Sequence, residues 1–243
     1  MDKTAFSLLH AMEDSWWYRG RALVVGKALS VVARVPGRAF DVGAGFGGMA
    51  ATLLRYASEL DGTEPDQGAR EKARARGYMN IYADLSAAHP PYDLIAIFDV
   101  LEHVADDVAF LDELRGALAD DGSLVLTVPA FPWLWSEHDV SHHHFRRYTR
   151  RSLRAALERS GFEVSFLSYW NMFLFIPAAI VRMLGGSGAA SLALPHFLDA
   201  LFYAVVRAES LLLPALRLPF GTGIIAVVRK TKAPRTSLNP REV

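Results

Sequence analysis

The chain has 243 residues, of which 51% are hydrophobic, and this is enough to form the core of one substantial α/β domain. Its 26 basic residues balance its 26 acidic residues, which argues against nucleic acid as a partner because binding to a phosphate backbone uses a broad positive field. The absence of cysteine excludes disulfide bonds, thiolate metal ligands and a cysteine nucleophile.

The segment before the first strand signal combines apolar residues with aromatic and guanidinium groups. We expect residues 1–36 to form a helical cap. Trp16 and Trp17 either anchor this cap by packing or contact a substrate. Arg19 or Arg21 can bind a carboxylate or phosphate of that substrate at two points, because a guanidinium group is a planar fork.

A glycine-rich turn follows the first strand signal, which begins at Ala39. The sequence there reads Asp41-Val42-Gly43-Ala44-Gly45-Phe46-Gly47-Gly48. Alternate glycines allow the backbone to turn sharply and approach a ligand closely, and an acid at a strand end can hold a polar ligand group. The turn therefore predicts a nucleotide-type pocket. Gly43, Gly45 and Gly48 also match the G-x-G-x-x-G spacing of dinucleotide enzymes, which is weak evidence alone.

Strand and helix signals alternate along the chain, which predicts a doubly wound, mainly parallel sheet of seven strands covered on both faces. A ligand would then bind beyond the carboxyl ends of the strands. The strands are expected at Ala39–Val42, Leu60–Glu64, Met79–Tyr82, Tyr92–Phe98, Ser123–Val128, Phe162–Tyr169 and Thr222–Arg229. The helices between them are expected at Gly48–Ala57, Asp66–Arg76, Ala105–Ala119 and Arg151–Ser160.

Two acidic residues follow the next strand signals at positions suited to a nucleoside. Glu64 ends the second signal, where a carboxylate can accept hydrogen bonds from both ribose hydroxyls. Its alternative role is that of a carboxylate favoured at a helix N-terminus. Asp84 follows the third signal and can accept from an adenine amino group while Leu85 packs on the ring, or it is a solvated loop residue.

These residues belong to a longer pattern. The chain resembles the class I S-adenosylmethionine-dependent methyltransferases roughly from Phe40 to Val164. The resemblance depends on Asp41–Gly47, Glu64, Asp84, Tyr92–Ile95, the segment Phe98-Asp99-Val100-Leu101-Glu102-His103-Val104, and Gly122–Pro129, which occur in the order and spacing of that family.

The resemblance implies a Rossmann-like fold whose seventh strand lies between the fifth and the sixth. It also implies S-adenosyl-L-methionine as the cofactor and S-adenosyl-L-homocysteine as its product. By position, the glycine turn approaches the methionine part, Glu64 holds the ribose, Asp84 meets the adenine, and Phe98–His103 borders the methyl group. The implied cofactor-binding residues are Asp41, Gly43, Ala44, Gly45, Glu64, Pro65, Asp84, Leu85, Phe98, Asp99 and His103.

A long connection between the last two strands departs from the family pattern. We expect one methyltransferase domain over residues 1–229, with this connection as an insertion at 170–221 and a mobile tail at 230–243. Apolar residues at helical spacing within Leu198–Val206 predict an amphipathic helix. Met172–Val181 is nearly uncharged but too short to span a bilayer, and we expect Pro177 to kink it. The insertion is therefore packed on the core, a lid or pocket for an apolar substrate, or a membrane-surface contact.

Histidines gather after the fifth strand, in a stretch that has the features of a loop. Methyl transfer from a sulfonium needs a positioned acceptor and removal of its proton, for which an imidazole is suited. We expect His142 or His144 to be the general base, followed by His138 oriented by Asp139. The pair His138 and His142 could instead begin a zinc site, but there is no H-E-x-x-H order, and we expect no metal.

The residues after the histidines complete the predicted substrate site. We expect Arg146, Arg147 and Tyr148 to contact the acceptor. The alternative is that the arginines form the solvated start of a helix. The predicted function is methylation of a small, hydrophobic or aromatic acceptor at oxygen, nitrogen or carbon. The alternatives are an NAD-dependent oxidoreductase and a membrane-associated protein that binds the cofactor without turnover. No secretory signal is recognisable, so we expect a cytoplasmic protein that contacts a membrane, if at all, through residues 170–221.

Overall fold

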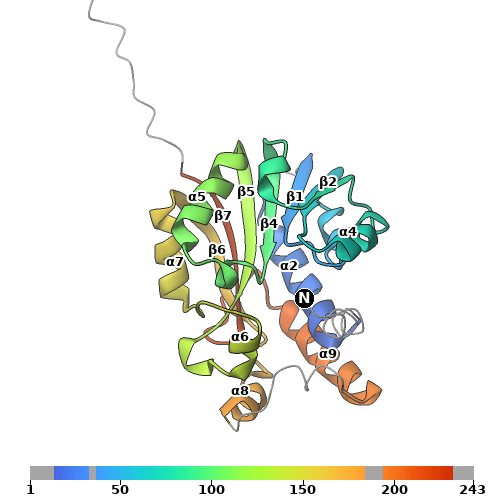
Figure 1. Cartoon of the computed structure of the whole chain (residues 1–243). Helices are drawn as coiled ribbons and strands as arrows, with labels where there is room; N and C mark the ends of the chain where they lie inside the picture. The colour runs from blue at the N-terminus through green and yellow to red at the C-terminus, as the bar shows by residue number, and fades with distance from the viewer. Residues whose placement is uncertain (1–13, 33–36, 184–193, 232–243) are drawn as a thin grey trace, which may run out of the picture.

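The computed structural model describes residues 14–32, 37–183 and 194–231. Part of the predicted cap and nearly all of the predicted mobile tail lie outside these residues. Within them, seven strands form one sheet in the order β3-β2-β1-β4-β5-β7-β6 (Figure 1). The strands are β1 (Arg38–Val42), β2 (Glu59–Thr63), β3 (Asn80–Tyr82), β4 (Tyr92–Phe98), β5 (Leu118–Pro129), β6 (Phe162–Trp170) and β7 (Gly223–Lys230).

The pairing of these strands confirms the predicted sheet. Strands β1 to β5 pair in parallel, and β7 lies antiparallel between β5 and β6. The central strand β4 is fully buried from Leu94 to Ile97, as expected where helices cover both faces of a parallel sheet. Because β1, β2 and β4 run in the same direction, their carboxyl ends meet at one edge.

Helices surround this sheet and pack in neighbouring groups. Helix α5 lies beside α7, which covers β6, and α2 lies beside α3 and α9 (Figure 1). The α-helices are α2 (Trp16–Leu29), α3 (Ala50–Leu53), α4 (Gln67–Arg74), α5 (Asp107–Ala117), α6 (Glu137–Ser141), α7 (Arg150–Arg159), α8 (Phe175–Met183) and α9 (His196–Ser210). Three short 3₁₀ turns are η1 (Leu85–Ala87), η2 (Leu101–His103) and η3 (Pro132–Leu134).

Several elements differ from the expectations. Strand β5 already begins at Leu118, within the predicted helix Ala105–Ala119, and α5 ends at Ala117. Helix α3 is shorter than the predicted Gly48–Ala57, because the backbone bonds around it, such as Tyr56 N–H to Leu53 O, close tighter three-residue turns. The stretch expected as a loop contains α6, which begins with a capping box formed by Ser136 and Asp139. Pro177 does not kink α8, because it lies in the first turn, where a backbone N–H has no intrahelical partner.

The insertion packs its helix α9 against α2. A Cβ at Gly20 would lie 2.8 Å from Val206 Cγ1, so the two helices approach closely. The rings of Trp16 and Phe202 meet edge to face at 5.4 Å between centroids. The predicted apolar stripe is only partly covered, since Leu201 is 54% exposed. Across the described ranges, the helices are all too short or too polar to cross a membrane.

Candidate active site

A cavity of about 690 Å³ opens beyond the carboxyl ends of β1, β2 and β4. We divide its lining into two parts. The strand-end half comprises the lining residues within 41–69 and 98–103, together with the end of β5. The helical half comprises the lining residues within 16–21, 138–147 and 170–223, from α2, α6, α8, α9 and their connections.

Backbone contacts between β1 and β2 shape the glycine turn of the strand-end half. The N–H groups of Gly43 and Ala44 donate to Thr63 O at 3.0 and 2.8 Å. Gly43 has a φ of +76°, and a Cβ there would lie 2.7 Å from Val100 Cγ2. Only glycine fits this position, because both the left-handed backbone and the contact exclude a side chain. The backbone therefore turns sharply here, as the sequence predicts, and the close approach of a ligand to this turn stays a prediction.

Two acids at the same edge are oriented by neighbouring groups. The oxygens of Glu64 accept from Gly45 N–H at 3.0 Å and Asp66 N–H at 2.9 Å. Burial raises the pKa of Glu64 in spite of these bonds. Asp41 is buried and accepts from Tyr78 Oη at 2.5 Å, and burial raises its pKa to about 7. Glu64 thus faces the cavity as a fixed carboxylate.

An ion pair joins the cap helix α2 to the end of β4. Arg21 Nη1 donates to Asp99 Oδ2 at 2.7 Å, and Thr127 Oγ1 donates to Asp99 Oδ1 at 3.2 Å. Asp99 has a φ of +56°, a left-handed conformation that Asp tolerates better than most residues. The Arg21 guanidinium also lies over the rings of Trp17 and Tyr18. The sequence suggested Arg21 as an alternative to Arg19 for binding an anionic substrate group, but not its pairing with Asp99, which lies 78 positions away in the sequence.

The histidine segment of the helical half is organised around the fully buried Asp139. Its Oδ1 accepts from His144 Nδ1 at 2.8 Å and from Arg147 Nε at 2.7 Å. Its Oδ2 accepts from Ser136 N–H at 2.9 Å and lies 3.6 Å from Arg182 Nη1. Burial acts to raise the pKa of Asp139, but these donors outweigh it and hold the pKa well below its usual value.

The structure assigns different partners to the three predicted bases. Asp139 pairs with His144 and not with His138 as expected, because the left-handed His143 (φ +56°) turns the chain back toward α6. His142 Nδ1 lies 2.8 Å from His138 O, and since a carbonyl only accepts, this nitrogen carries the proton. The Nε2 atoms of His142 and His144 are thus the lone-pair nitrogens. Burial and the neighbouring His142 lower the pKa of His138 to about 4.

Three titratable side chains meet where the two halves join. The ligand atoms of Glu102, His103 and His144 all lie within 4.8 Å of one another. Glu102 is 1% exposed, and burial and the neighbouring Asp99 raise its pKa well above the usual value. Phe145 N–H donates to Glu102 O at 2.7 Å, which ties the histidine segment to η2. The sequence motif around Glu102 was visible, but its contact with His144 was not.

The far wall of the helical half is apolar. It is lined by Trp170, Leu174, Pro177, Ala178, Val181 and Phe202. A buried carboxylate holds this wall together, because Glu209 of α9 accepts from the backbone N–H groups of Asn171, Met172 and Phe173 at 2.5, 2.6 and 3.0 Å. Burial nevertheless raises the pKa of Glu209. Glu209 therefore connects α9 to the turn between β6 and α8.

Most of the predicted site residues line this cavity, including all three bases, Trp16, Trp17 and Arg147. Asp84 bonds to Ser86 in η1, and Tyr148 donates to Asp107 Oδ2 at 2.9 Å. Arg19 instead pairs with Asp199 of α9. The predicted residues that do not line the cavity are Arg19, Pro65, Asp84, Leu85, Arg146 and Tyr148.

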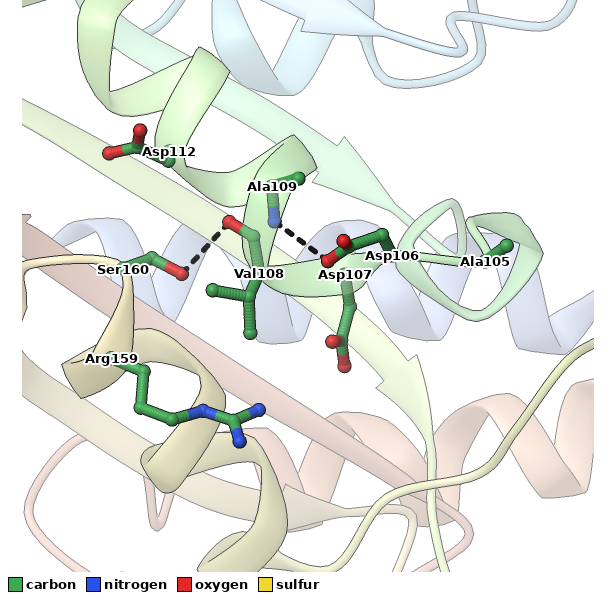
Figure 2. Close-up of a pocket in the computed structure, with 8 residues that line it drawn as sticks. All are labelled: Ala105, Asp106, Asp107, Val108, Ala109, Asp112, Arg159 and Ser160. Carbon is green, nitrogen blue, oxygen red and sulfur yellow. Dashed lines mark hydrogen bonds between the residues drawn. The ribbon is translucent and has the colours of Figure 1, made fainter.

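A second hollow, of about 770 Å³, lies between the start of α5 and the end of α7. Figure 2 shows Ser160 Oγ donating to Val108 O at 3.2 Å and Asp106 capping α5 through Ala109 N–H at 3.0 Å. It is larger but more open than the first cavity, and none of the predicted catalytic or cofactor residues lines it. We therefore assign the chemistry to the first cavity.

Comparisons with known proteins identify the family of the chain. The sequence matches the model of a methyltransferase domain family over residues 18–165. No curated protein matches it significantly.

Solved structures share the fold at low sequence identity. A chain of the complex between the Haloferax volcanii Trm112 methyltransferase activator and a methyltransferase is 18% identical, with 96% of each chain covered and a TM-score of 0.59. The plantazolicin methyltransferase BamL, solved with a triazolic desmethylPZN analog and SAH, is 14% identical; 95% of this chain and 90% of that chain are covered, with a TM-score of 0.58. An S-adenosylmethionine-dependent methyltransferase from Clostridium acetobutylicum is 11% identical, with 88% and 92% covered and a TM-score of 0.55.

Proposed function

The chain belongs to the class I S-adenosylmethionine-dependent methyltransferases, and we propose that it methylates a small, mainly apolar acceptor in the helical half of the cavity. The observation that carries this proposal is one continuous cavity with an oriented carboxylate at one end and an apolar wall at the other. The similar structure of BamL, whose name gives plantazolicin as its substrate, supports an acceptor that is not a nucleic acid.

We propose that the cofactor occupies the strand-end half, with Glu64 on the ribose and the turn at Gly43 and Gly45 near the methionine part. Each oxygen of Glu64 already accepts one backbone N–H and keeps a lone pair for a ribose hydroxyl. When bound, S-adenosylmethionine supplies a sulfonium methyl group for in-line displacement and leaves as S-adenosylhomocysteine. Asp84 bonds to Ser86 outside the cavity, so the proposal rests on Glu64 and the glycines.

The acceptor is proposed to lie between α2, α8 and α9. The apolar lining favours a largely hydrophobic molecule, while His142, His144 and Arg182 supply polar contacts at one side. Arg182 is held near Asp139 and by a 3.1 Å hydrogen bond to Ser136 Oγ. The packing of α9 on α2 makes the cap and the insertion a shared cover for this part of the cavity.

We propose that His142 or His144 removes the proton of the acceptor. Both present an Nε2 lone pair because Nδ1 is occupied by an acceptor group, and Asp139 would stabilise a protonated His144. His138 ranks third, because a pKa of about 4 makes it a weak base at neutral pH. Substitution of His142 or His144 by Ala should lower turnover while cofactor affinity stays. Full turnover in both single variants and in the double variant would exclude this role.

The outer side of the insertion supports a further part of the proposal, a contact with a membrane surface. Ile176, Ile180 and Met183 of α8 are 65%, 51% and 75% exposed, and Trp133 of η3 is 56% exposed. Vesicle flotation of the protein and of an Ile176→Asp/Ile180→Asp variant would test this contact. Equal flotation of the two proteins, or none of either, would remove it.

Calorimetric titration with S-adenosylmethionine tests the cofactor assignment. We expect Glu64→Ala to weaken binding about 100-fold or more, because two hydrogen bonds to a charged group contribute about 1.5–3 kcal/mol each. The matched control is Glu59→Ala, which removes a half-exposed carboxylate from the opposite end of β2 and should leave the affinity unchanged. Unchanged affinity in Glu64→Ala would contradict the ribose role. Release of S-adenosylhomocysteine in a screen of aromatic, amine and prenyl-type acceptors would test turnover.

A further inference from the structure

The junction of the two halves contains a group of side chains that methyl transfer from a sulfonium does not itself require. Glu102 and His103 come from η2, and His144 comes from the segment after α6. All three line the cavity, and their ligand atoms lie within 4.8 Å of one another. Metal ligands lie about 2.0–2.2 Å from a zinc ion, so small side-chain movements bring three such atoms around one cation.

One oxygen of the carboxyl group in this cluster lacks a hydrogen-bond partner among the described residues. Glu102 is 1% exposed, and its Oε2 has no hydrogen-bond donor among the described residues. The guanidinium groups of Arg21 and Arg147 donate to Asp99 and Asp139. A buried and unpaired carboxylate oxygen is unfavourable, and a cation at this point would compensate it.

One imidazole in this group is already held as metal ligands usually are. His144 Nδ1 bonds to Asp139 Oδ1 at 2.8 Å, which leaves Nε2 with its lone pair. Asp139 is itself fixed by Arg147 and by the capping box at Ser136. A carboxylate behind a histidine in this way sets its tautomer and ring orientation and is typical of metal-binding histidines.

The second imidazole faces the first from η2. The rings of His103 and His144 meet edge to face at 4.6 Å between centroids, and His103 is exposed toward the cavity. Two imidazoles and one carboxylate leave coordination positions open. This donor set suits Zn²⁺, Mn²⁺ or Fe²⁺ better than Mg²⁺ or Ca²⁺, which prefer oxygen ligands.

We propose that Glu102, His103 and His144 bind one divalent first-row transition ion at the acceptor end of the cavity. This inference rests on the proposed function, whose acceptor would occupy an open position of the ion. The ion would make a bound hydroxyl more acidic, and His142 Nε2 would take its proton. The oxygen lone pair then forms the bond to the methyl carbon while the electron pair of the broken C–S bond stays on sulfur. In this proposal His144 is a ligand of the ion, and His142 is the general base.

The test is titration of the chelator-treated full-length protein with Zn²⁺, Mn²⁺ and Mg²⁺ by calorimetry. We expect one Zn²⁺ or Mn²⁺ per chain and weaker binding of Mg²⁺. Replacing the residue behind a metal-binding histidine typically weakens affinity about 10- to 100-fold, so Asp139→Asn should show a loss of that size. Glu102→Gln and His144→Ala should lose at least as much. His143→Asn is the matched control, since it keeps a left-handed residue between His142 and His144 and should bind as the unmodified protein does.

Absence of stoichiometric binding, or unchanged affinity in both Glu102→Gln and His144→Ala, would overturn the metal site. If Glu102→Gln does not fold, His103→Ala replaces it, because that side chain is exposed. Titration of the same samples with S-adenosylmethionine separates the two proposals. Cofactor binding without metal binding rejects only the ion, whereas metal binding without cofactor binding rejects the proposed function.

Discussion

The two halves of the cavity are built by different kinds of contact. In the strand-end half, backbone N–H groups orient the key carboxylate, as those of Gly45 and Asp66 do for Glu64. In the helical half, charged side chains from separate elements hold one another, as Arg182 of α8 and Asp139 of α6 do. Contacts made by backbone groups persist when nearby side chains are substituted, whereas a buried network of charged side chains is disrupted when any one member is replaced. We therefore expect single substitutions to affect the two halves differently.

The largest expected effect is on stability, in the helical half. Asp139→Ala leaves Arg147 and Arg182 without their buried counter-ion and should lower the free energy of unfolding by about 3–5 kcal/mol. Urea unfolding measures the loss, and Glu137→Ala, an exposed acid in the same helix, is the control. A loss no greater than that of the control would show that the two halves do not differ in this way.

The next effect is a pH dependence of the free energy of unfolding, which arises from Asp41 in the strand-end half. Burial raises the pKa of Asp41 from its usual 3.8 to about 7 in the folded chain, so the unfolded chain releases this proton at lower pH. The contribution of Asp41 to the free energy of unfolding should therefore fall as pH rises from about 4 to 7 and stay constant above.

Asp41→Asn removes this titration. Since one pKa unit corresponds to about 1.4 kcal/mol, the variant should gain a few kcal/mol relative to the unmodified chain between pH 4 and pH 8. Urea unfolding across that range measures the gain, with the exposed Asp84→Asn as the control. A difference between variant and unmodified chain that stays constant with pH would show that Asp41 is not buried as an acid.

The smallest effect compares two glycines. Gly43→Ala forces a side chain into a left-handed position and against Val100, which should cost about 1–3 kcal/mol and weaken cofactor binding. Gly26→Ala in α2 should instead stabilise by about 0.4–1 kcal/mol, because a Cβ there meets no described atom within 4 Å. Thermal unfolding with and without S-adenosylmethionine measures both. Two changes of the same sign would contradict the special role of Gly43.

The same contrast explains what the sequence could predict. The glycine turn and Glu64 were recognisable because their residue types and spacing are local signals beside strands. The position of the seventh strand between the fifth and the sixth followed from the family resemblance and is confirmed. The bounds of β4 were predicted to the residue, because a continuous apolar run marks a strand buried on both faces.

The contacts of the helical half were beyond reach because they join residues that no local pattern connects. Arg21 of α2 pairs with Asp99 at the end of β4, and Asp139 pairs with His144 and not with its neighbour His138. One signal was present and missed: Ser136 and Asp139 are spaced as a capping box, which predicts α6. The burial of Glu102 has no sequence signature at all.

The carboxylate of Glu209 has a consequence for exchanging acceptor preference between related enzymes. Glu209 belongs to α9 but accepts hydrogen bonds from three successive backbone N–H groups just before α8. It therefore holds the two helices together. A chimera that received only one of these helices would leave either the three backbone donors or the buried carboxylate without its partner. Chimeras that retain activity should therefore transplant the β6–α8 turn and α9 as a matched pair.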